Sequence, residues 1–398
     1  MLKTGLIIGI LAGSAAGVAS AETADVPVRR IDIGLGAQVD YDSNVLRTSA
    51  SVPGRGKDDI IASPTLSADI LLPFSRNSVF LNGTLAYRFY RDHNELNREA
   101  INLNSGGEVR LGQRCAVDGV ASWRRQQTDL GDIYDSLDPK NTEQSLTESA
   151  RASCNRGLGF APSASVTHRT VTNSAQIRKE NNFNVDTVDV ALGYSRPLFG
   201  TIAIYGIWSD ATYPDRIAIA PGANDGTRTY QLGVRYERDI GTRLSGKVSL
   251  GWSKVNPKLA GVLGFQGLFY SADLTALVSE RLQLALSAAR TVEQSNLLSI
   301  SYSITDMANA EARYAFSPLV RLVVGATWTK RNLHRSPAVL DPVFVPDDRL
   351  WDLHARLSFR HSNRLSFGLD ASYRDRQSRT NFNNYNSFRA GISAQFTL

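Results

Sequence analysis

Cysteine and methionine are scarce in this sequence, which contains two of each among 398 residues. Two cysteines cannot supply a disulfide-dense scaffold. After the N-terminal region no run of about 18 or more apolar residues occurs, which excludes an α-helical membrane protein. Apolar residues make up 42% of the chain and are evenly spread, which argues against disorder. A soluble globular protein or a transmembrane β-barrel remains, because only alternate residues of a barrel strand need to be apolar.

The N-terminal segment, residues 1–21, has the composition of a secretory signal. Lys3 is followed by an apolar stretch rich in Ala and Gly, and the segment ends in Ala-Ser-Ala. This pattern predicts a cleaved signal peptide, with the cut between Ala21 and Glu22, followed by a short periplasmic segment over 22–30. A membrane anchor is the alternative, but the apolar stretch is short and a cleavage site ends it. The mature chain is therefore expected outside the cytoplasm.

From residue 31 onward the chain alternates with a period of two, which predicts β-strands. In the last segment Phe388, Ile392 and Phe396 share one parity, while Arg389 and Ser393 share the other. No window of useful length has a helical period. The expected strands are 31–42, 59–72, 77–91, 97–111, 115–128, 143–154, 158–171, 182–196, 200–213, 227–239, 243–254, 267–279, 282–293, 299–315, 319–331, 349–361, 365–376 and 385–398.

The connections between these strands alternate in length. Turns after even strands are short, as in Glu280-Arg281, whereas those after odd strands are mostly long, as in 43–58, 129–142 and 332–348. Short periplasmic turns and longer outer loops are typical of bacterial outer-membrane barrels. We therefore predict an all-β, single-domain, transmembrane antiparallel up-and-down β-barrel of about 18 strands over residues 31–398, with sixteen strands as an open alternative. A soluble sandwich or propeller is disfavoured, because soluble strands usually have about five or six residues.

Aromatic residues fall at two levels of the predicted barrel. All the tryptophans lie toward the outer surface, where they would form an aromatic girdle: Trp123, Trp208, Trp252, Trp328 and Trp351. Other rings gather at the opposite level: Phe74, Phe160, Tyr194, Phe199, Tyr236, Phe316, Phe359 and Phe396.

The two cysteines stand at matching ends of neighbouring strands. Cys115 begins one expected strand, Cys154 ends the next, and the midpoint between them lies within the loop 129–142. Hairpin register then places the two side chains opposite each other on one face. In the oxidising periplasm this predicts a cross-strand disulfide near the periplasmic rim. Two free thiols, or a register shifted by one residue, are the alternatives.

The polar parity of the strands should line the lumen. Its cations, the candidate pore-lining residues, are Arg88, Arg110, Arg124, Arg151, Arg169, Arg235, Lys247, Arg313, Arg321, Arg356, Arg360, Arg374 and Arg389. They outnumber the carboxylates expected there, which are Glu108, Asp118, Asp189, Glu237, Asp273, Glu311, Asp352 and Asp370. Such a wet, basic lumen would favour anionic solutes. Alternatively, the charges form cross-strand ion pairs that stiffen the wall. Two lumen tyrosines, Tyr90 and Tyr205, could stack on sugars.

Catalytic and metal-binding patterns are weak in this chain. None of the five histidines has a paired ligand at metal spacing, and no G-x-S-x-G motif occurs. We therefore expect no catalytic residues, no metal and no cofactor, although a Ser, His and Asn arrangement across strands stays open, as in outer-membrane hydrolases. The cations are dispersed, so no nucleic acid is expected. Expected partners are outer-membrane lipid and lipopolysaccharide. The loops 43–58 and 332–348 are long enough to constrict a pore.

Residues 41–47, which read YDSNVLR, resemble the opening motif of a family of outer-membrane β-barrels. Genes of that family often accompany those for exopolysaccharide or capsule synthesis and export. The resemblance implies a porin-like channel in the Gram-negative outer membrane, contributing to polysaccharide secretion, with polysaccharide or export proteins as partners. Leu46 departs from the aromatic residue usual there. The C-terminal strand, with Phe396 and Leu398, resembles the signal read by the barrel-assembly machinery. A non-conducting structural or interaction barrel and an outer-membrane hydrolase are the alternatives.

Overall fold

The computed structural model describes residues 28–49, 57–128, 130, 141–154, 158–216, 225–295, 300–336, 346–379 and 384–398. The predicted signal peptide over 1–21 lies outside the described residues, as does most of the segment 22–30. No helix among the described residues is long and apolar enough to cross a membrane.

Most of the described chain is strand. The strands are β1 (Arg30–Asp42), β2 (Asp59–Phe74), β3 (Asn77–Tyr90), β4 (Arg98–Leu111), β5 (Cys115–Gln127), β6 (Thr142–Cys154), β7 (Gly159–Asn173), β8 (Phe183–Arg196), β9 (Gly200–Thr212), β10 (Gly226–Ile240), β11 (Leu244–Pro257), β12 (Phe265–Leu277), β13 (Leu282–Glu293), β14 (Ile300–Ala315), β15 (Val320–Arg335), β16 (Asp347–Arg360), β17 (Leu365–Ser378) and β18 (Tyr385–Thr397). Two short 3₁₀ helices, η1 (Asn94–Leu96) and η3 (Gln176–Asn181), lie in connections.

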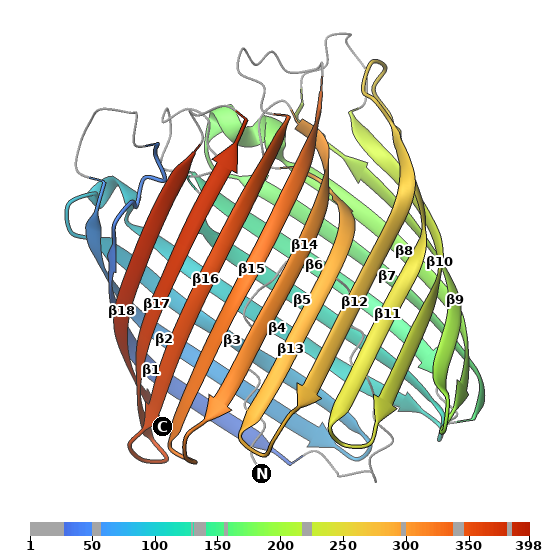
Figure 1. Ribbon diagram of the computed structural model, residues 1–398, viewed down its shortest axis with the longest axis horizontal. Coiled ribbons are helices and arrows are strands. Elements are labelled where there is room, and N and C mark those ends of the chain that lie inside the picture. Colours follow the sequence, from blue (N-terminus) through green and yellow to red (C-terminus); the bar gives the residue numbers. More distant parts are fainter. Residues whose placement is uncertain are drawn as a thin grey trace.

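The strands form one closed sheet of 18 strands. Each strand pairs antiparallel with its neighbours in sequence, and β1 also pairs with β18, so that no edge is left free. The strands are inclined to the axis of the barrel (Figure 1). This confirms the predicted up-and-down barrel, and closure satisfies every backbone ladder, as a membrane-spanning sheet requires.

The two ends of the barrel differ. At one end, which we call the turn end, short turns such as 241–243 join the strands, and Gly241 there has φ 61°, in the left-handed region that favours glycine. The other end, which we call the loop end, carries the long connections and η3, the green helical turn at the upper rim of Figure 1. In the expected orientation the turn end faces the periplasm.

The outer face of the barrel is apolar and exposed. Along β18, Phe388, Ile392 and Phe396 are 46%, 61% and 40% exposed. The same parity continues around the barrel with exposed Leu, Val, Ile and Phe side chains. Such a continuous apolar face is unfavourable in water and suits the hydrocarbon layer of a membrane.

Several strands extend further at the loop end than the sequence predicts. β15 was expected to end at residue 331 but continues to Arg335, and β11 continues to Pro257. The polar residues there hide the alternation of apolar side chains. The extension of β15 is held by its pairing with β14, where Tyr302 and His334 stack with ring centroids 4.3 Å apart.

Candidate pore

The strand register places the predicted lumen cations on the inner face, opposite in parity to the exposed apolar side chains. They lie on strands all around the barrel: Arg88, Arg110, Arg124, Arg151, Arg169, Arg235, Lys247, Arg313, Arg321, Arg356, Arg360, Arg374 and Arg389.

About half of these cations form ion pairs with inner-face carboxylates. The pairs are Arg110–Glu108 (3.0 Å), Arg235–Asp189 (3.5 Å), Arg313–Glu311 (2.5 Å), Arg374–Asp352 (2.5 Å), Arg389–Asp40 (2.5 Å) and Arg356–Asp370. Nearer the loop end, Asp348 is fully buried and accepts from both Arg331 and Arg376 at 2.6 Å. On these strands the charges are mutually neutralised, which suits a stiff wall.

The remaining cations form no ion pair with a described residue, and three of them lie on consecutive strands. Arg124, Arg151 and Arg169 belong to β5, β6 and β7, and we call them the basic strip. The register sets Arg124 beside Ser145 and Arg169 beside Thr147, so that small hydroxyl side chains separate the two guanidinium groups. The basic strip therefore offers guanidinium groups outside direct ion pairs, together with hydroxyl groups, on one side of the lumen, although Asp118 stands opposite Arg151. The other cations of this kind are Arg88, Lys247, Arg321 and Arg360.

Arg169 is held in place by an aromatic ring. Its guanidinium carbon lies 5.6 Å from the centroid of the Phe183 ring, a distance that permits a cation–π interaction. Its Nε is buried and has no hydrogen-bond partner among the described residues. This stacking fixes the guanidinium without neutralising its charge.

The two lumen tyrosines are packed away from the lumen space, which corrects the expectation that they stack on sugars. Tyr205 is only 2% exposed, because its ring meets Phe269 edge-on at 6.1 Å and Arg235 lies over it at 4.4 Å. Tyr205 and Phe269 belong to β9 and β12, and they meet over Gly233 and Gly251, where a Cβ on Gly251 would lie 2.6 Å from the Phe269 ring. Tyr90 is 8% exposed, in a cluster with Val45, Ile61 and Leu96.

At the loop end a buried polar network, which we call the cap, joins connections and strands that are not neighbours in the sheet. At its centre Arg216 and Asp225 form an ion pair of 3.1 Å, and neither side chain is exposed. Arg216 also donates to the carbonyl of Ile300, and Asp225 accepts from the hydroxyls of Ser301 and Ser336 at 3.2 and 2.6 Å. The cap thus ties the connection after β9 to β14 and to the end of β15.

Tyr213 adds a second anchor to the cap. Its hydroxyl accepts from the backbone N–H of Ser295 at 3.0 Å and donates to the carbonyl of Ser301 at 2.8 Å. Burial raises the pKa of the Tyr213 phenol, so the group stays protonated and able to donate. The Arg216 guanidinium lies over its ring at 3.8 Å.

A chain of side-chain amides extends the cap around the rim. Asn141 donates to Asn173 at 2.8 Å, and Asn182 accepts from the backbone N–H of Asn173 at 2.7 Å. Asn182 then donates to Asp215 at 2.7 Å. Connections after β5, β7 and β9 are joined in this way. Sequence reasoning pointed instead to the loops 43–58 and 332–348, parts of which lie outside the described residues.

The motif at residues 41–47 has a structural role at the seam where β1 meets β18. Asp42 is 2% exposed and accepts from Arg47 at 2.8 Å and from the hydroxyl of Ser387 on β18 at 2.7 Å. Asn44 donates to the carbonyl of Asn386 on β18 at 3.0 Å. Arg47 itself has φ 53°. The motif therefore fastens the first loop to the last strand, which the sequence alone did not reveal.

The tryptophans share the outer face. Trp208, Trp252 and Trp351 are 38%, 56% and 47% exposed, and Trp328 is the cross-strand partner of Trp351. Trp123 has the same outward parity on β5. At the turn end, rings from the second predicted group also meet, since Phe160 and Tyr194 lie 5.6 Å apart and Phe199 and Tyr236 lie 5.7 Å apart.

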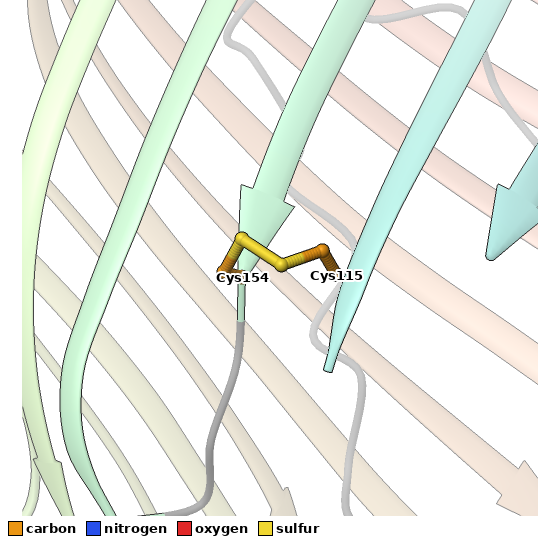
Figure 2. Close-up of a disulfide and its surroundings, with 2 residues drawn as sticks. All are labelled: Cys115 and Cys154. Atoms are coloured by element: carbon orange, nitrogen blue, oxygen red, sulfur yellow. A yellow bond between two sulfur atoms is a disulfide. The ribbon is translucent and has the colours of Figure 1, made fainter. Parts of the chain in front are cut away.

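Cys115 and Cys154 are joined by a disulfide between β5 and β6 (Figure 2). The two residues are register partners, with Cα atoms 4.0 Å apart. They have the same outward parity as Leu111 on β4, which is the partner of Cys115. The disulfide therefore links β5 to β6 on the outer face of the barrel, at the turn end.

Comparison with known proteins gives one family match. Residues 216–397 match the family described as "Putative beta-barrel porin 2". No curated protein matches the chain. Among solved structures, OccK2 (OpdF) of Pseudomonas aeruginosa, crystallised with glucuronate, is 12% identical with a TM-score of 0.46, covering 92% of this chain and 98% of that one. A BenF-like porin from Pseudomonas fluorescens Pf-5 is 13% identical with a TM-score of 0.46, covering 92% and 99%.

The closed sheet, the exposed apolar outer face and the matching C-terminal part agree with one another. This chain is therefore a closed antiparallel β-barrel of 18 strands with an apolar outer face, and its C-terminal part is similar to a family of β-barrel porins.

Proposed function

We propose that the barrel is a channel whose lumen favours anionic, hydroxyl-rich solutes. Barrels of about 16 to 18 strands enclose an aqueous channel rather than a packed core. The observation that carries the proposal is the basic strip: Arg124, Arg151 and Arg169 form no ion pair with a described residue. Guanidinium groups of this kind bind carboxylates bidentately and donate to sugar hydroxyls.

Both explanations of the lumen charges apply, each to different strands. The ion-paired cations of β14 and β16–β18 hold the wall, and the basic strip on β5–β7 is left to act on the solute. A solute passing close to the strip would meet guanidinium groups that are not held in direct ion pairs with described carboxylates. The basic strip is the place where three such cations lie on consecutive strands, whereas the other unpaired cations are scattered among ion pairs.

The double variant Arg124→Gln, Arg169→Gln tests this assignment by reversal potential in a salt gradient. A guanidinium about 7 Å from a permeating anion in water contributes about 0.6 kcal/mol, or about threefold in anion occupancy. The anion preference should therefore fall severalfold in the double variant. A matched control is Arg356→Gln with Asp370→Asn, which removes a neutral pair and should leave selectivity unchanged. Equal selectivity in all three proteins would contradict the role of the basic strip.

We further propose that the solute is a secreted polysaccharide. The support is the resemblance at residues 41–47, together with a lumen chemistry suited to acidic, hydroxyl-rich chains. Deleting the gene in a host that secretes such a polymer should leave the polymer in the periplasm, and restoring the gene should release it. Unchanged export in the deletion strain would contradict this assignment and leave the channel assignment standing.

One observation favours a second candidate, a barrel that conducts little. The cap joins several connections across the loop end and contains a fully buried ion pair. A capped barrel could serve as an anchor for polysaccharide or export proteins. Conductance of the purified protein separates the two, because a channel carries current and an anchoring barrel does not.

A further inference from the structure

Three polar side chains form a hydrogen-bonded row on the outer face of the barrel. His168 and Thr170 lie two residues apart on β7, and Asp186 lies on β8 as the register partner of His168. The His168 Nδ1 and an Asp186 carboxylate oxygen are 2.7 Å apart. The His168 Nε2 and the Thr170 hydroxyl are 3.0 Å apart.

For a neutral His168, the chemistry of the groups fixes the direction of both bonds. An ionised carboxylate can only accept a hydrogen bond, so the His168 Nδ1 carries the proton and donates to Asp186. Nε2 is then the unprotonated nitrogen, and it accepts from the Thr170 hydroxyl. A hydroxyl that donates to an imidazole held by a carboxylate is the arrangement of a nucleophile, a general base and its orienting acid.

These groups face outward, away from the lumen. They share their parity with Val166 and Val190, which are 54% and 55% exposed. The side chains of His168 and Asp186 are themselves 44% and 60% exposed. Polar groups deep in the lipid-facing wall are unfavourable, and this row lies near the loop end of β7 and β8, where the wall reaches the interface.

The row lies close to the level of the outward tryptophans. Trp208 on β9 is the register partner of Val188, which is two residues from Asp186 on the same face. Outward tryptophans lie at the membrane interface. The acyl ester groups of lipids also lie in this interfacial zone, and the row stands on its loop-end side, since Thr170 pairs with Asn184 near the start of β8.

A shallow depression next to His168 suits an acyl chain. It is lined by Ala150, Val166 and Val188 on the apolar side, with His168 and Asp186 at its edge. Glu148, the partner of His168 on β6, also borders it. The small apolar side chains leave room for a hydrocarbon chain.

We propose that Thr170, His168 and Asp186 form a catalytic site that hydrolyses acyl esters of outer-leaflet lipids, an activity separate from the channel. The Thr170 Oγ1 attacks the ester carbonyl carbon as its proton passes to the His168 Nε2. The lipid alcohol leaves with that proton, and the acyl group stays on Thr170. Water then attacks the acyl ester, giving one proton to His168, and the fatty acid departs as this proton returns to the Thr170 oxygen.

Side-chain amides are placed to stabilise the oxyanion. Asn184 on β8 is the cross-strand partner of Thr170, and Gln144 on β6 is the partner of Thr172 on the same outward face. Directly opposite residues have Cβ atoms about 4.5–5.5 Å apart, within reach of an amide donor. Such a donor near a tetrahedral intermediate contributes substantially to catalysis.

The purified full-length barrel in mixed micelles tests the proposal with two probes. A diacyl phosphatidylethanolamine reports fatty-acid release, and an alkyl fluorophosphonate forms a stable phosphonyl ester on an activated hydroxyl by losing fluoride. We expect both reactions in the unaltered protein, with the label at Thr170 in peptide mass spectra. Thr170→Val, which keeps the shape and removes the hydroxyl, should abolish the label and lower release at least about a hundredfold. Thr170→Ser should retain activity.

Three further variants show whether the activity depends on these side chains. Thr172→Val is the matched control on the same strand and face, and it should behave like the unaltered protein. Asp186→Asn should lower kcat while leaving KM unchanged, as expected for a positioning residue. His168→Gln should lose the label. Folding of each is checked by heat-dependent migration in gels, and conductance by all of them should be equal. A folded barrel without label at Thr170, or ester release that persists in Thr170→Val, overturns the proposal and leaves the channel assignment untouched.

Discussion

Arg216 and Asp225 face each other across 3.1 Å in the cap, with no part of either side chain exposed. They stand just before and just after the undescribed stretch 217–224, so their ion pair closes the base of this connection. Around them are hydroxyl and carbonyl groups from β14 and from the end of β15. A buried pair with this many partners holds its surroundings together, because removing one charge leaves the other unpaired.

Asp225→Asn is expected to loosen the cap without unfolding the barrel. The loss of one charge from a buried pair costs about 3–5 kcal/mol, and the closed sheet does not depend on it. Single-channel recordings should show larger conductance or more frequent openings, and external protease should cut the loop-end connections faster. Asp347→Asn, which breaks the exposed pair Arg379–Asp347 at 3.2 Å, is the matched control and should change neither. Identical recordings from both variants would show that the cap does not limit the pore.

The seam between β1 and β18 depends on the buried pair Arg47–Asp42. Arg47→Gln removes a charge-assisted hydrogen bond to a buried carboxylate and should lower the free energy of unfolding by about 1–3 kcal/mol. The control is Arg30→Gln, since the pair Arg30–Asp69 at the turn end of the same strand is exposed and contributes little. Urea titrations of both variants in micelles supply the measurement. A larger loss of unfolding free energy in Arg30→Gln than in Arg47→Gln would contradict the proposed role of the Arg47–Asp42 pair.

The Cys115–Cys154 disulfide closes a loop of 39 positions. Replacing both cysteines with serine should lower the stability by about 2–4 kcal/mol, because the unfolded chain regains loop entropy. Denaturant midpoints give the value. A reducing agent should shift the midpoint of the unaltered protein by the same amount and leave the double variant unchanged. Equal denaturant midpoints of the unaltered protein with and without reductant would show that the disulfide does not stabilise the fold.

The outward tryptophans should lie near the membrane surface. Fluorescence quenching in vesicles compares lipids that carry a nitroxide near the head group with lipids that carry it deep in the acyl chain. The shallow label should quench more strongly, since an indole is favoured at the interface. Trp208→Phe and Trp252→Phe variants assign the signal to single residues. Stronger quenching by the deep label would instead place the outward tryptophans in the bilayer centre.

The fold could be predicted from the sequence because it depends on local patterns. Period-two alternation specifies strands and their faces, and the lengths of the connections specify which end of the barrel is which. The β5–β6 hairpin register followed from the positions of Cys115 and Cys154 in the same way. The extension of β15 to Arg335 could not be predicted from the sequence, because its pairing with β14 and the stacking of His334 on Tyr302 are nonlocal.

Only part of the candidate pore could be predicted from the sequence. Parity indicates the inner face but not which cations find a carboxylate, as Arg356 does and Arg169 does not. Parity also says nothing about accessibility, which is why Tyr205 was expected to meet sugars although Phe269 and Arg235 cover it. The cap depends on contacts between residues far apart in sequence, such as Ser336 and Asp225, separated by 111 positions.

We expect this barrel to conduct ions and to favour anions over cations. Reversal potential of the unaltered protein in a planar bilayer, with a tenfold potassium chloride gradient, tests it most directly. We expect stepwise conductance and a reversal potential displaced toward the chloride equilibrium potential. A membrane that stays insulating with correctly folded protein inserted, or a displacement toward the potassium equilibrium potential, would contradict the account.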